Sequence, residues 1–525
     1  MNKFNRLLTL FLLGYLVVPS ALGQDKEQLP NIVIIMGDDL GWGDLSCYGA
    51  TGTYTPAIDS LAAHGMRFTD AHSSSSLCSP SRYSLMTGRY SWRTHLKKGV
   101  LKWFAKPLIE EGRTTLGTML QAQGYQTAYI GKWHLGFEWP LLADRLPADA
   151  DKEVFDTWER TSQDYIDFSQ PVKQGPTQRG FDYYYGIAAS NNMIPFVFIE
   201  NDRVVQPPTV EKEYVYDTDQ AKPRAPNWEL EKLDQHLTEQ AVKVIDHHFS
   251  SVTKNPLMLI FSTASVHRPC LPTFTKGKSK AGLRGDMVLE FDWVVNEVVQ
   301  ALKQHGAFEN TLLIVTSDNG AVPGDPVFAL ERYHRDLGDK YYLDYFDGQV
   351  PEHIDPNGNE IAQKGWYTYG HASAGPFRGF KSEPWEGGHR IPLIVHWPGK
   401  IRAGNVNDNM ICNADVMATL AELTGYQGGI GQDSYSFLTN LLSQSPDQPR
   451  QSMVLASGRS GALIARMGEW KYIAEADGHQ KGSLYNMIDD SKEQHNVYNQ
   501  YPDTVMAIQQ LIDQVEQYNK RETLP

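Results

Sequence analysis

The sequence predicts an α/β fold with a large, mostly parallel sheet sandwiched between helices, followed by a smaller C-terminal α+β subdomain. Four apolar runs carry the first part of this prediction: residues 31–39 (NIVIIMGDD), 127–134 (TAYIGKWH), 257–267 (LMLIFSTASVH) and 311–319 (TLLIVTSDN). Each is a continuous run of β-branched and aliphatic residues without polar alternation, which is typical of strands covered on both faces. Alternation of such strands with helices favours a parallel sheet.

Segments between these runs have the apolar spacing of helices. The clearest are residues 55–66 (TPAIDSLAAHGM), 114–124 (TTLGTMLQAQG) and 287–306 (MVLEFDWVVNEVVQALKQHG). Their apolar residues recur three and four positions apart, as on one face of an α-helix. These segments are expected to cover the faces of the sheet.

The last part of the chain has a different pattern. Residues 452–458, 461–475 and 482–490 are short strand candidates separated by turns, and residues 503–521 form an amphipathic helical pattern. Such strands predict a short antiparallel sheet. A Ser-, Gln- and Pro-rich stretch precedes them, so we expect a main domain over residues 24–440 and a subdomain over residues 441–525.

The first 23 residues are expected to be an export signal. Lys3 and Arg6 give a basic start, residues 7–18 are apolar, and residues 21–23 (ALG) offer small residues for cleavage. The apolar run is too short to span a bilayer, and no cysteine follows it that could carry a lipid anchor. We therefore expect export machinery as a partner, no stable membrane insertion, and a periplasmic or secreted protein.

The charge and cysteine content exclude some classes of protein. The formal charge is −14, and it becomes −16 without residues 1–23, which argues against nucleic acid as a partner. An anionic substrate would need a locally basic pocket. The four cysteines, Cys47, Cys78, Cys270 and Cys412, are too few for a disulfide scaffold. One or two bridges stay open, and the sequence does not choose among the pairings.

Two acidic pairs follow predicted strands and suggest a metal site. Asp38 and Asp39 end one run, and Asp318 and Asn319 end another. The carboxyl ends of parallel strands meet at one edge of the sheet, where sites form. An all-oxygen set suits a hard divalent cation such as Ca²⁺. Taken alone, each pair also fits a turn or a helix N-cap; both pairs at strand ends, with basic residues nearby, favour the metal site.

Basic residues are expected at the same edge. Lys132 and His134 lie two apart on an extended segment, and Arg82 and Lys381 can join them. Several fixed cations beside a metal make a pocket for a tetrahedral oxyanion, either sulfate or phosphate. His267 follows a strand and is a candidate general acid for a leaving alkoxide. The alternatives are solvated surface charges and a histidine with a purely structural role.

Cys78 lies in the segment CSPSR, where Pro80 and Arg82 follow it at two and four residues. A thiolate is a soft ligand for a hard cation, no dedicated base lies near it in sequence, and a free thiol is at risk in an oxidising compartment. A role as disulfide partner, metal ligand or nucleophile therefore leaves Pro80 and Arg82 unexplained.

The segment CSPSR resembles the C-x-P-x-R signature of type I, formylglycine-dependent sulfatases, and MTGR follows where that family has L-T-G-R. Further segments resemble the family in order: MGDDLGWGDLSCYGA, YIGKWHLG, SVHRP, TSDNG and FRGFKSEPWEGGHRIPLIVHWPG. The resemblance covers nearly the whole mature chain. It implies an alkaline phosphatase-like fold, a catalytic domain over residues 24–440, and hydrolysis of sulfate esters. It also implies that Cys78 is the precursor of formylglycine, made by a dedicated maturation enzyme.

The resemblance implies a role for each matching position. Calcium would be bound by Asp38, Asp39, Asp318, Asn319 and an oxygen of the modified Cys78. Arg82 would hold the modified side chain. Sulfate would be clamped by Lys132, His134 and Lys381, with Ser190 as a further contact, and His267 would protonate the departing alcohol.

The substrate is expected to be a sulfated glycan, either a polysaccharide or an oligosaccharide. Arg93 lies among aromatic residues just after the CSPSR segment, and His371 and Trp385 flank Lys381. Aromatic rings beside basic groups suit a sulfated sugar, although the same rings also fit a hydrophobic core. Two other functions stay open: a phosphodiester or phosphonate hydrolase with the same nucleophile, and a catalytically silent glycan-binding protein with an unmodified Cys78. The sugar and the sulfate position are not readable from the sequence.

Overall fold

A computed structural model gives the fold. It describes residues 29–142, 162–214, 221–252, 255–322, 371–443, 450–475 and 482–521. The expected export signal lies outside these residues. Among the described helices, none is both long and apolar enough to cross a membrane.

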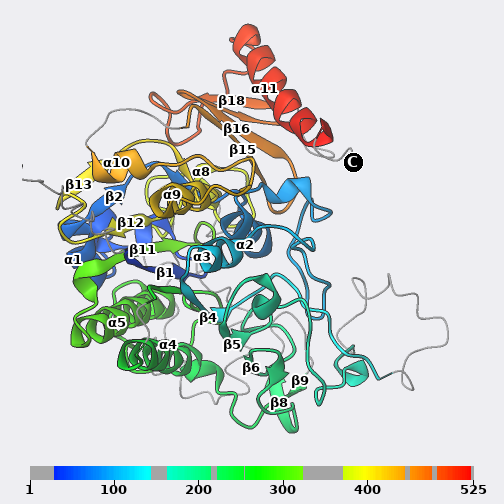
Figure 1. Cartoon of the computed structure of the whole chain (residues 1–525). Coiled ribbons are helices and arrows are strands. Elements are labelled where there is room, and N and C mark those ends of the chain that lie inside the picture. The colour runs from blue at the N-terminus through cyan, green and yellow to red at the C-terminus, as the bar shows by residue number, and fades with distance from the viewer. Residues whose placement is uncertain are drawn as a thin grey trace, which may run out of the picture.

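A ten-stranded sheet forms the centre of the main domain (Figure 1). In spatial order its strands are β13 (Asn405–Asn407), β2 (Met66–Phe68), β12 (Leu393–His396), β11 (Thr311–Ser317), β1 (Asn31–Gly37), β10 (Leu257–Ser262), β4 (Gln126–Lys132), β5 (Tyr183–Ile187), β6 (Ile199–Glu200) and β7 (Arg203–Val204). The five from β11 to β5 are parallel, and β12, β6 and β7 pair antiparallel with their neighbours towards the centre. The mostly parallel sheet is as predicted.

The central strands are buried along their whole length, which explains their continuous apolar sequences. Every residue of β1 and β11 is buried. Register places Ile34 beside Ile260 of β10 on one side and Ile314 of β11 on the other. The four predicted runs are therefore neighbours, in the order β11-β1-β10-β4, and their carboxyl ends lie at one edge of the sheet.

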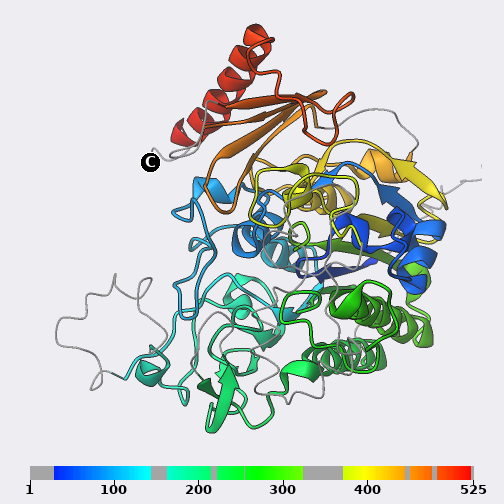
Figure 2. The same cartoon turned by 180° about the vertical axis from the view of Figure 1, so that it is seen from behind.

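Helices cover both faces of the sheet, as Figures 1 and 2 show from opposite sides. One layer contains α1 (Pro56–His64), α4 (Leu233–Ser250) and α5 (Gly282–Gln304). The other contains α2 (Cys78–Thr87), α3 (Leu116–Ala122), α9 (Asp415–Thr424) and α10 (Leu438–Leu442). The short helix α8 (Glu386–His389) precedes β12. This three-layer arrangement is the predicted one.

A four-stranded antiparallel sheet follows the main domain, with the long C-terminal helix beside it at the top of Figure 1. Its order is β15 (Ser452–Ala456), β16 (Leu463–Met467), β17 (Trp470–Ile473) and β18 (Ser483–Asn486), and the helix is α11 (Pro502–Arg521). Ile464, Leu484 and Ile508 belong to a separate apolar core here. The predicted antiparallel sheet is confirmed, whereas the domain boundary at residues 440/441 stays a prediction.

Two short pairs of strands complete the description: β14 (Ile411–Cys412) beside β3 (Ala71–His72), and β8 (Val210–Tyr214) beside β9 (Ala221–Arg224). The four cysteines all lie in the described part of the chain, and no disulfide bond joins any two of them.

Candidate active site

The site is built around Cys78, the first residue of α2. Leu77 before it is extended, and Pro80 fits the first turn because the amide groups there need no helical partner. The helix ends at Gly88, whose φ of 64° is the left-handed conformation that favours glycine. Cys78 is therefore held at a helix N-terminus, the end that attracts anions.

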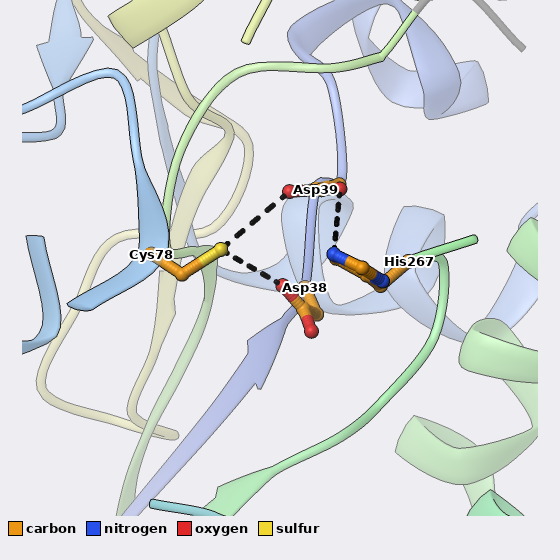
Figure 3. Close-up of side chains that lie close together, drawn as sticks. All are labelled: Asp38, Asp39, Cys78 and His267. Carbon is orange, nitrogen blue, oxygen red and sulfur yellow. Dashed lines mark hydrogen bonds and ion pairs between the residues drawn. The ribbon is translucent and has the colours of Figure 1, made fainter. Parts of the chain in front are cut away.

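The Cys78 sulfur faces the two aspartates that follow β1 (Figure 3). Its Sγ lies 3.6 Å from Oδ1 of Asp38 and 4.0 Å from Oδ1 of Asp39. The side chain is only 1% exposed, and burial raises the pKa of the thiol to about 12. Burial and the nearby Asp38 carboxylate therefore favour the neutral thiol over the thiolate, which is the nucleophilic form.

Asp39 has a backbone conformation that the surrounding residues hold in place. Its φ of 63° is uncommon for a residue other than glycine. Its N–H donates to Oδ1 of Asp318 at 3.1 Å, and its carbonyl accepts from Arg284 at 2.8 Å. These contacts point the Asp39 carboxylate towards Cys78.

Asp318 and Asn319, which follow β11, complete the oxygen-rich group. Nδ2 of Asn319 donates to Oδ1 of Asp39 at 2.8 Å, whereas Oδ1 of Asn319 is buried and accepts no hydrogen bond. A buried acceptor without a donor is costly unless a cation or water binds it. The carboxylates of Asp38 and Asp39, the Cys78 sulfur and a ring nitrogen of His267 also lie within 4.8 Å of one another. This donor set fits a divalent cation.

Arg82 lies one helical turn after Cys78 and is fully buried. Its Nε and Nη2 lie 2.9 and 2.8 Å from Oδ2 of Asp318, and its Nη1 donates to Lys132 O and Ser262 Oγ. Burial opposes its charge, but Asp318 and Asp38 raise the pKa of Arg82. Arg82 therefore ties α2 to the ends of three strands.

Two lysines approach the aspartates from different segments. Nζ of Lys132 lies 2.5 Å from Oδ2 of Asp38, and Nζ of Lys381 lies 2.7 Å from Oδ2 of Asp39. Burial opposes the charges of Asp39 and Lys381. Even so, Lys381 lowers the pKa of Asp39, and Asp39 raises the pKa of Lys381.

The position of Lys132 depends on Gly131 beside it, because a Cβ there would lie 1.8 Å from the Ser262 carbonyl oxygen. Only glycine lets β4 approach β10 this closely.

His267 and Ser190 lie next to Lys132. Oγ of Ser190 lies 2.8 Å from Nζ of Lys132 and 3.3 Å from Nε2 of His267. Nδ1 of His267 lies near two acceptors, Arg268 O at 2.6 Å and Asn191 Oδ1 at 3.1 Å, which assigns a proton to Nδ1. Nε2 thus faces the aspartates, 3.7 Å from Oδ2 of Asp39. Burial and Lys381 lower the pKa of His267.

His134 is buried beside the cluster with one nitrogen unsatisfied. Its Nε2 donates to Leu101 O at 2.9 Å, and its Nδ1 has no hydrogen-bond partner. Burial, Lys132 and Arg82 lower the pKa of His134. The unsatisfied Nδ1 is a polar atom available to a bound ligand.

Three candidate substrate residues make contacts away from this cluster. Arg93 binds Asp433 through Nε and Nη2, each at 2.7 Å, and the amide of Asp433 bonds to Gly88. Gly88 lies at the opposite end of α2 from Cys78, about 15 Å away at 1.5 Å per residue. The substrate role of Arg93 stays a prediction.

The other two candidate substrate residues are Trp385 and His371. The Trp385 ring packs under Arg378 at 3.6 Å and against Tyr485 of the C-terminal sheet at 5.8 Å. Nε2 of His371 lies 2.9 Å from Oδ1 of Asp44. Asp44 in turn binds Arg284, which holds the Asp39 carbonyl. His371 is thus linked to the cluster through Asp44 and Arg284.

Several residues that support the site were not predicted from the sequence. Arg284 and Asp44 support Asp39 from α5 and from a short 3₁₀ turn, and no local pattern marks them. Asn191 contacts His267, and the only signal for it is its place beside Ser190. Ser262, at the end of β10, accepts from Arg82.

A second cluster, of His72, Glu386 and His389, has potential metal ligands. Its centre is taken up by the ammonium group of Lys471. Nζ of Lys471 lies 3.0 Å from Nε2 of His389 and 3.1 Å from Oε1 of Glu386. Burial lowers the pKa of both histidines. The cluster is a buried ion-pair network between the main domain and the C-terminal sheet.

Charge defines what the Cys78 cluster can bind. Asp38, Asp39 and Asp318 balance Arg82, Lys132 and Lys381, so the formal charges of these six groups sum to zero. A divalent cation would make the sum +2, which favours an anionic ligand held by Lys132, Lys381 and the helix N-terminus.

Comparisons with known proteins agree with this geometry. The sulfatase family model matches residues 30–426, and the model for the C-terminal part of N-sulphoglucosamine sulphohydrolase matches residues 381–521. An N-acetylgalactosamine-6-O-sulfatase of Bacteroides thetaiotaomicron is 29% identical, over 94% of both chains. Arylsulfatase G of Rattus norvegicus is 31% identical, over 77% of this chain and 67% of its own.

Solved structures have the same architecture. One, from work on the metabolism of multiple glycosaminoglycans by Bacteroides thetaiotaomicron, aligns with a TM-score of 0.75 and 29% identity, over 93% of this chain and all of that one. A sulfatase from Pseudoalteromonas sp. aligns with a TM-score of 0.66 at 24% identity, over 94% and 91% of the two chains. The second likeness supports the fold alone.

Proposed function

The chain belongs to the sulfatase family and is a sulfuric ester hydrolase, and we propose that its substrate is the sulfate ester of a sulfated carbohydrate. We propose further that the protein is exported and acts with a formylglycine made from Cys78 and one Ca²⁺ ion. The single observation that carries the proposal is the meeting of Cys78 with Asp38 and Asp39 beside Lys132 and Lys381.

The residues fit both a divalent cation and a formylglycine at position 78. Asp38, Asp39, Asp318 and Asn319 would hold the cation, and the Cys78 Cβ would carry the formylglycine oxygens beside the first two aspartates. When bound, these groups supply a nucleophilic oxygen and stabilise negative charge. Arg82 keeps α2 in place through Asp318, so the modified side chain keeps its orientation.

The remaining residues bind the sulfate group. Lys132 and Lys381 donate from two directions, with Ser190 between Lys132 and His267. These fixed donors compensate charge on the sulfate oxygens without having to reorganise. Because Lys132, Ser190 and His267 are buried, this side of the cluster also excludes bulk water from the reacting atoms.

His267 is placed to protonate the leaving alcohol. Arg268 O and Asn191 Oδ1 hold a proton on Nδ1, so Nε2 faces the cluster. Donation from Nε2 requires the doubly protonated ring, whose charge burial and Lys381 oppose and the Asp39 carboxylate favours. A sugar alkoxide is a poor leaving group, so proton donation contributes most with a carbohydrate substrate. Hydrolysis then releases the sugar alcohol and inorganic sulfate.

Two features support export and a glycan substrate. Residues 1–23 have the pattern of an export signal, and export brings an enzyme to extracellular polysaccharides. The bacterial relative named above is an N-acetylgalactosamine-6-O-sulfatase and aligns over 94% of both chains.

The test is release of inorganic sulfate by the purified protein from 6-sulfated N-acetylgalactosamine, a panel of sulfated disaccharides and 4-nitrophenyl sulfate, with the matching phosphate esters as competitors. We expect the highest kcat/KM on a sulfated sugar and almost none with Cys78→Ala. Faster hydrolysis of phosphate esters, or normal activity of Cys78→Ala, would overturn the proposal.

A further inference from the structure

A long groove lies between α1 and α5, and no residue of the Cys78 cluster lines it. Its volume is about 970 Å³. One wall is a stripe of α5 that runs from Leu289 through Trp293 and Asn296 to Lys303, spaced three to seven residues apart. At 1.5 Å per residue this stripe is about 21 Å long. The groove therefore has the shape needed by an extended chain.

Aromatic rings line the groove. Tyr54 is 69% exposed and Phe274 is 41% exposed, and Phe274 packs edge-on against Trp293 with ring centroids 5.1 Å apart. Exposed rings gathered in a groove contribute little to a core and mark a binding surface. Their flat apolar faces match the faces of sugar rings.

Polar groups accompany the rings along the same stripe. Ser60 of α1 and Asn296 and Gln300 of α5 offer hydroxyl and amide groups suited to sugar hydroxyls. Two exposed lysines, Lys278 and Lys303, line the groove together with Asp292 and Glu309, so the formal charges of these four groups cancel in a chain whose net charge is −14. A locally neutral groove that offers lysines beside aromatic rings repels a sulfated sugar less than the acidic chain as a whole does.

The groove begins on segments that also serve the active site. Phe274 lies seven residues after His267, in the connection from β10 to α5. Tyr54 follows Thr53, whose hydroxyl donates to the carbonyl oxygen of Asp44. A chain lying along α5 would therefore extend from the neighbourhood of the active-site loops.

We propose that this groove binds a stretch of sulfated glycan chain beyond the sulfate being removed. The proposal rests on the proposed function, since it extends the same substrate. It predicts that the enzyme holds polymeric substrate at two places: the Cys78 cluster and the groove between α1 and α5.

The experiment measures binding without turnover. The full chain with Cys78→Ala is titrated with chondroitin 6-sulfate, heparin and dextran sulfate by calorimetry, and Tyr54→Ala or Trp293→Ala is then added. We expect each added change to weaken Kd for at least one polymer about tenfold, the effect of losing one buried aromatic contact. Lys303→Gln should weaken binding and reduce its salt dependence. The matched control is Tyr501→Ala, which removes a ring that is 44% exposed on the C-terminal subdomain.

The outcomes separate this proposal from the proposed function. Unchanged Kd in the Tyr54→Ala protein, which should fold normally because that ring is so exposed, overturns the groove. So does absence of binding to all three polymers. Dimers in sedimentation that Trp293→Ala disperses would make the groove a protein interface and also overturn it. Sulfate release by the wild-type protein is measured separately. Polymer binding in the groove without sulfate release would contradict the proposed function alone, and sulfate release without binding in the groove would contradict the groove alone.

Discussion

Arg82 binds a single oxygen of Asp318, with Nε 2.9 Å and Nη2 2.8 Å from Oδ2. The other Asp318 oxygen accepts the Asp39 N–H at 3.1 Å. One carboxylate therefore joins the helix that carries Cys78 to the loop that carries Asp39. Because both groups are fully buried, removing one partner leaves an uncompensated charge.

Asp318→Asn keeps the shape of the side chain and removes its charge. We expect turnover to fall by at least about 100-fold and Tm to fall, because Arg82 loses its partner and the cation site loses a carboxylate. Sulfate release and thermal unfolding measure the two effects. Asp489→Asn, at an exposed position, is the control, and wild-type turnover in Asp318→Asn would contradict the role assigned to this pair.

Lys381→Ala tests the sulfate clamp. Loss of one charge-assisted hydrogen bond to the substrate should lower kcat/KM by about 100-fold while the fold is retained. Initial rates with 4-nitrophenyl sulfate measure this, and Lys492→Ala serves as the exposed-lysine control. A change confined to thermal stability would show that Lys381 only balances Asp39.

His267→Gln tests proton donation to the leaving group. A phenolate with a low pKa leaves without help, whereas a sugar alkoxide does not. The variant should therefore lose about 100-fold or more on a sulfated sugar and much less on 4-nitrophenyl sulfate. Equal losses on the two substrates would assign His267 to sulfate binding.

The fold and most of the site were predictable because they depend on local patterns. The runs around β1, β4, β10 and β11 are recognisable without context, since strands buried on both faces need continuous apolar sequence. Asp38 and Asp318 follow two of these strands, so parallel pairing alone brings them to one edge.

The remainder depends on contacts between residues far apart in sequence. Arg93 lies just after the CSPSR segment, and its partner Asp433 lies 340 residues away in sequence. Arg284 supports Asp39 across 245 residues. No local pattern reports such pairs, because ordinary and functional arginines have the same sequence signature.

Asp292 gives the protein a pH-dependent stability away from the Cys78 cluster. Its carboxylate accepts from Ala57 N and Ile58 N at the start of α1, and burial raises its pKa from 3.8 to about 6. Between these values the folded chain keeps a proton that the unfolded chain releases. Stability from this group is therefore present below pH 4 and is lost as pH rises through 6, by at most about 3 kcal/mol.

The test compares wild type with Asp292→Asn in thermal unfolding at pH 4 and pH 7. The variant carries no such titration, so its stability relative to wild type should increase between these two pH values. A constant difference in Tm would contradict the raised pKa.

Mass spectrometry of the peptide that contains Cys78, from protein produced with a formylglycine-generating enzyme, tests the central claim most directly. Cys78 and Arg82 are buried in the folded chain, so we expect modification to precede folding. The account predicts an aldehyde at position 78, in a fraction that rises with specific sulfatase activity across preparations. Full activity in a preparation whose residue 78 is entirely thiol would contradict it.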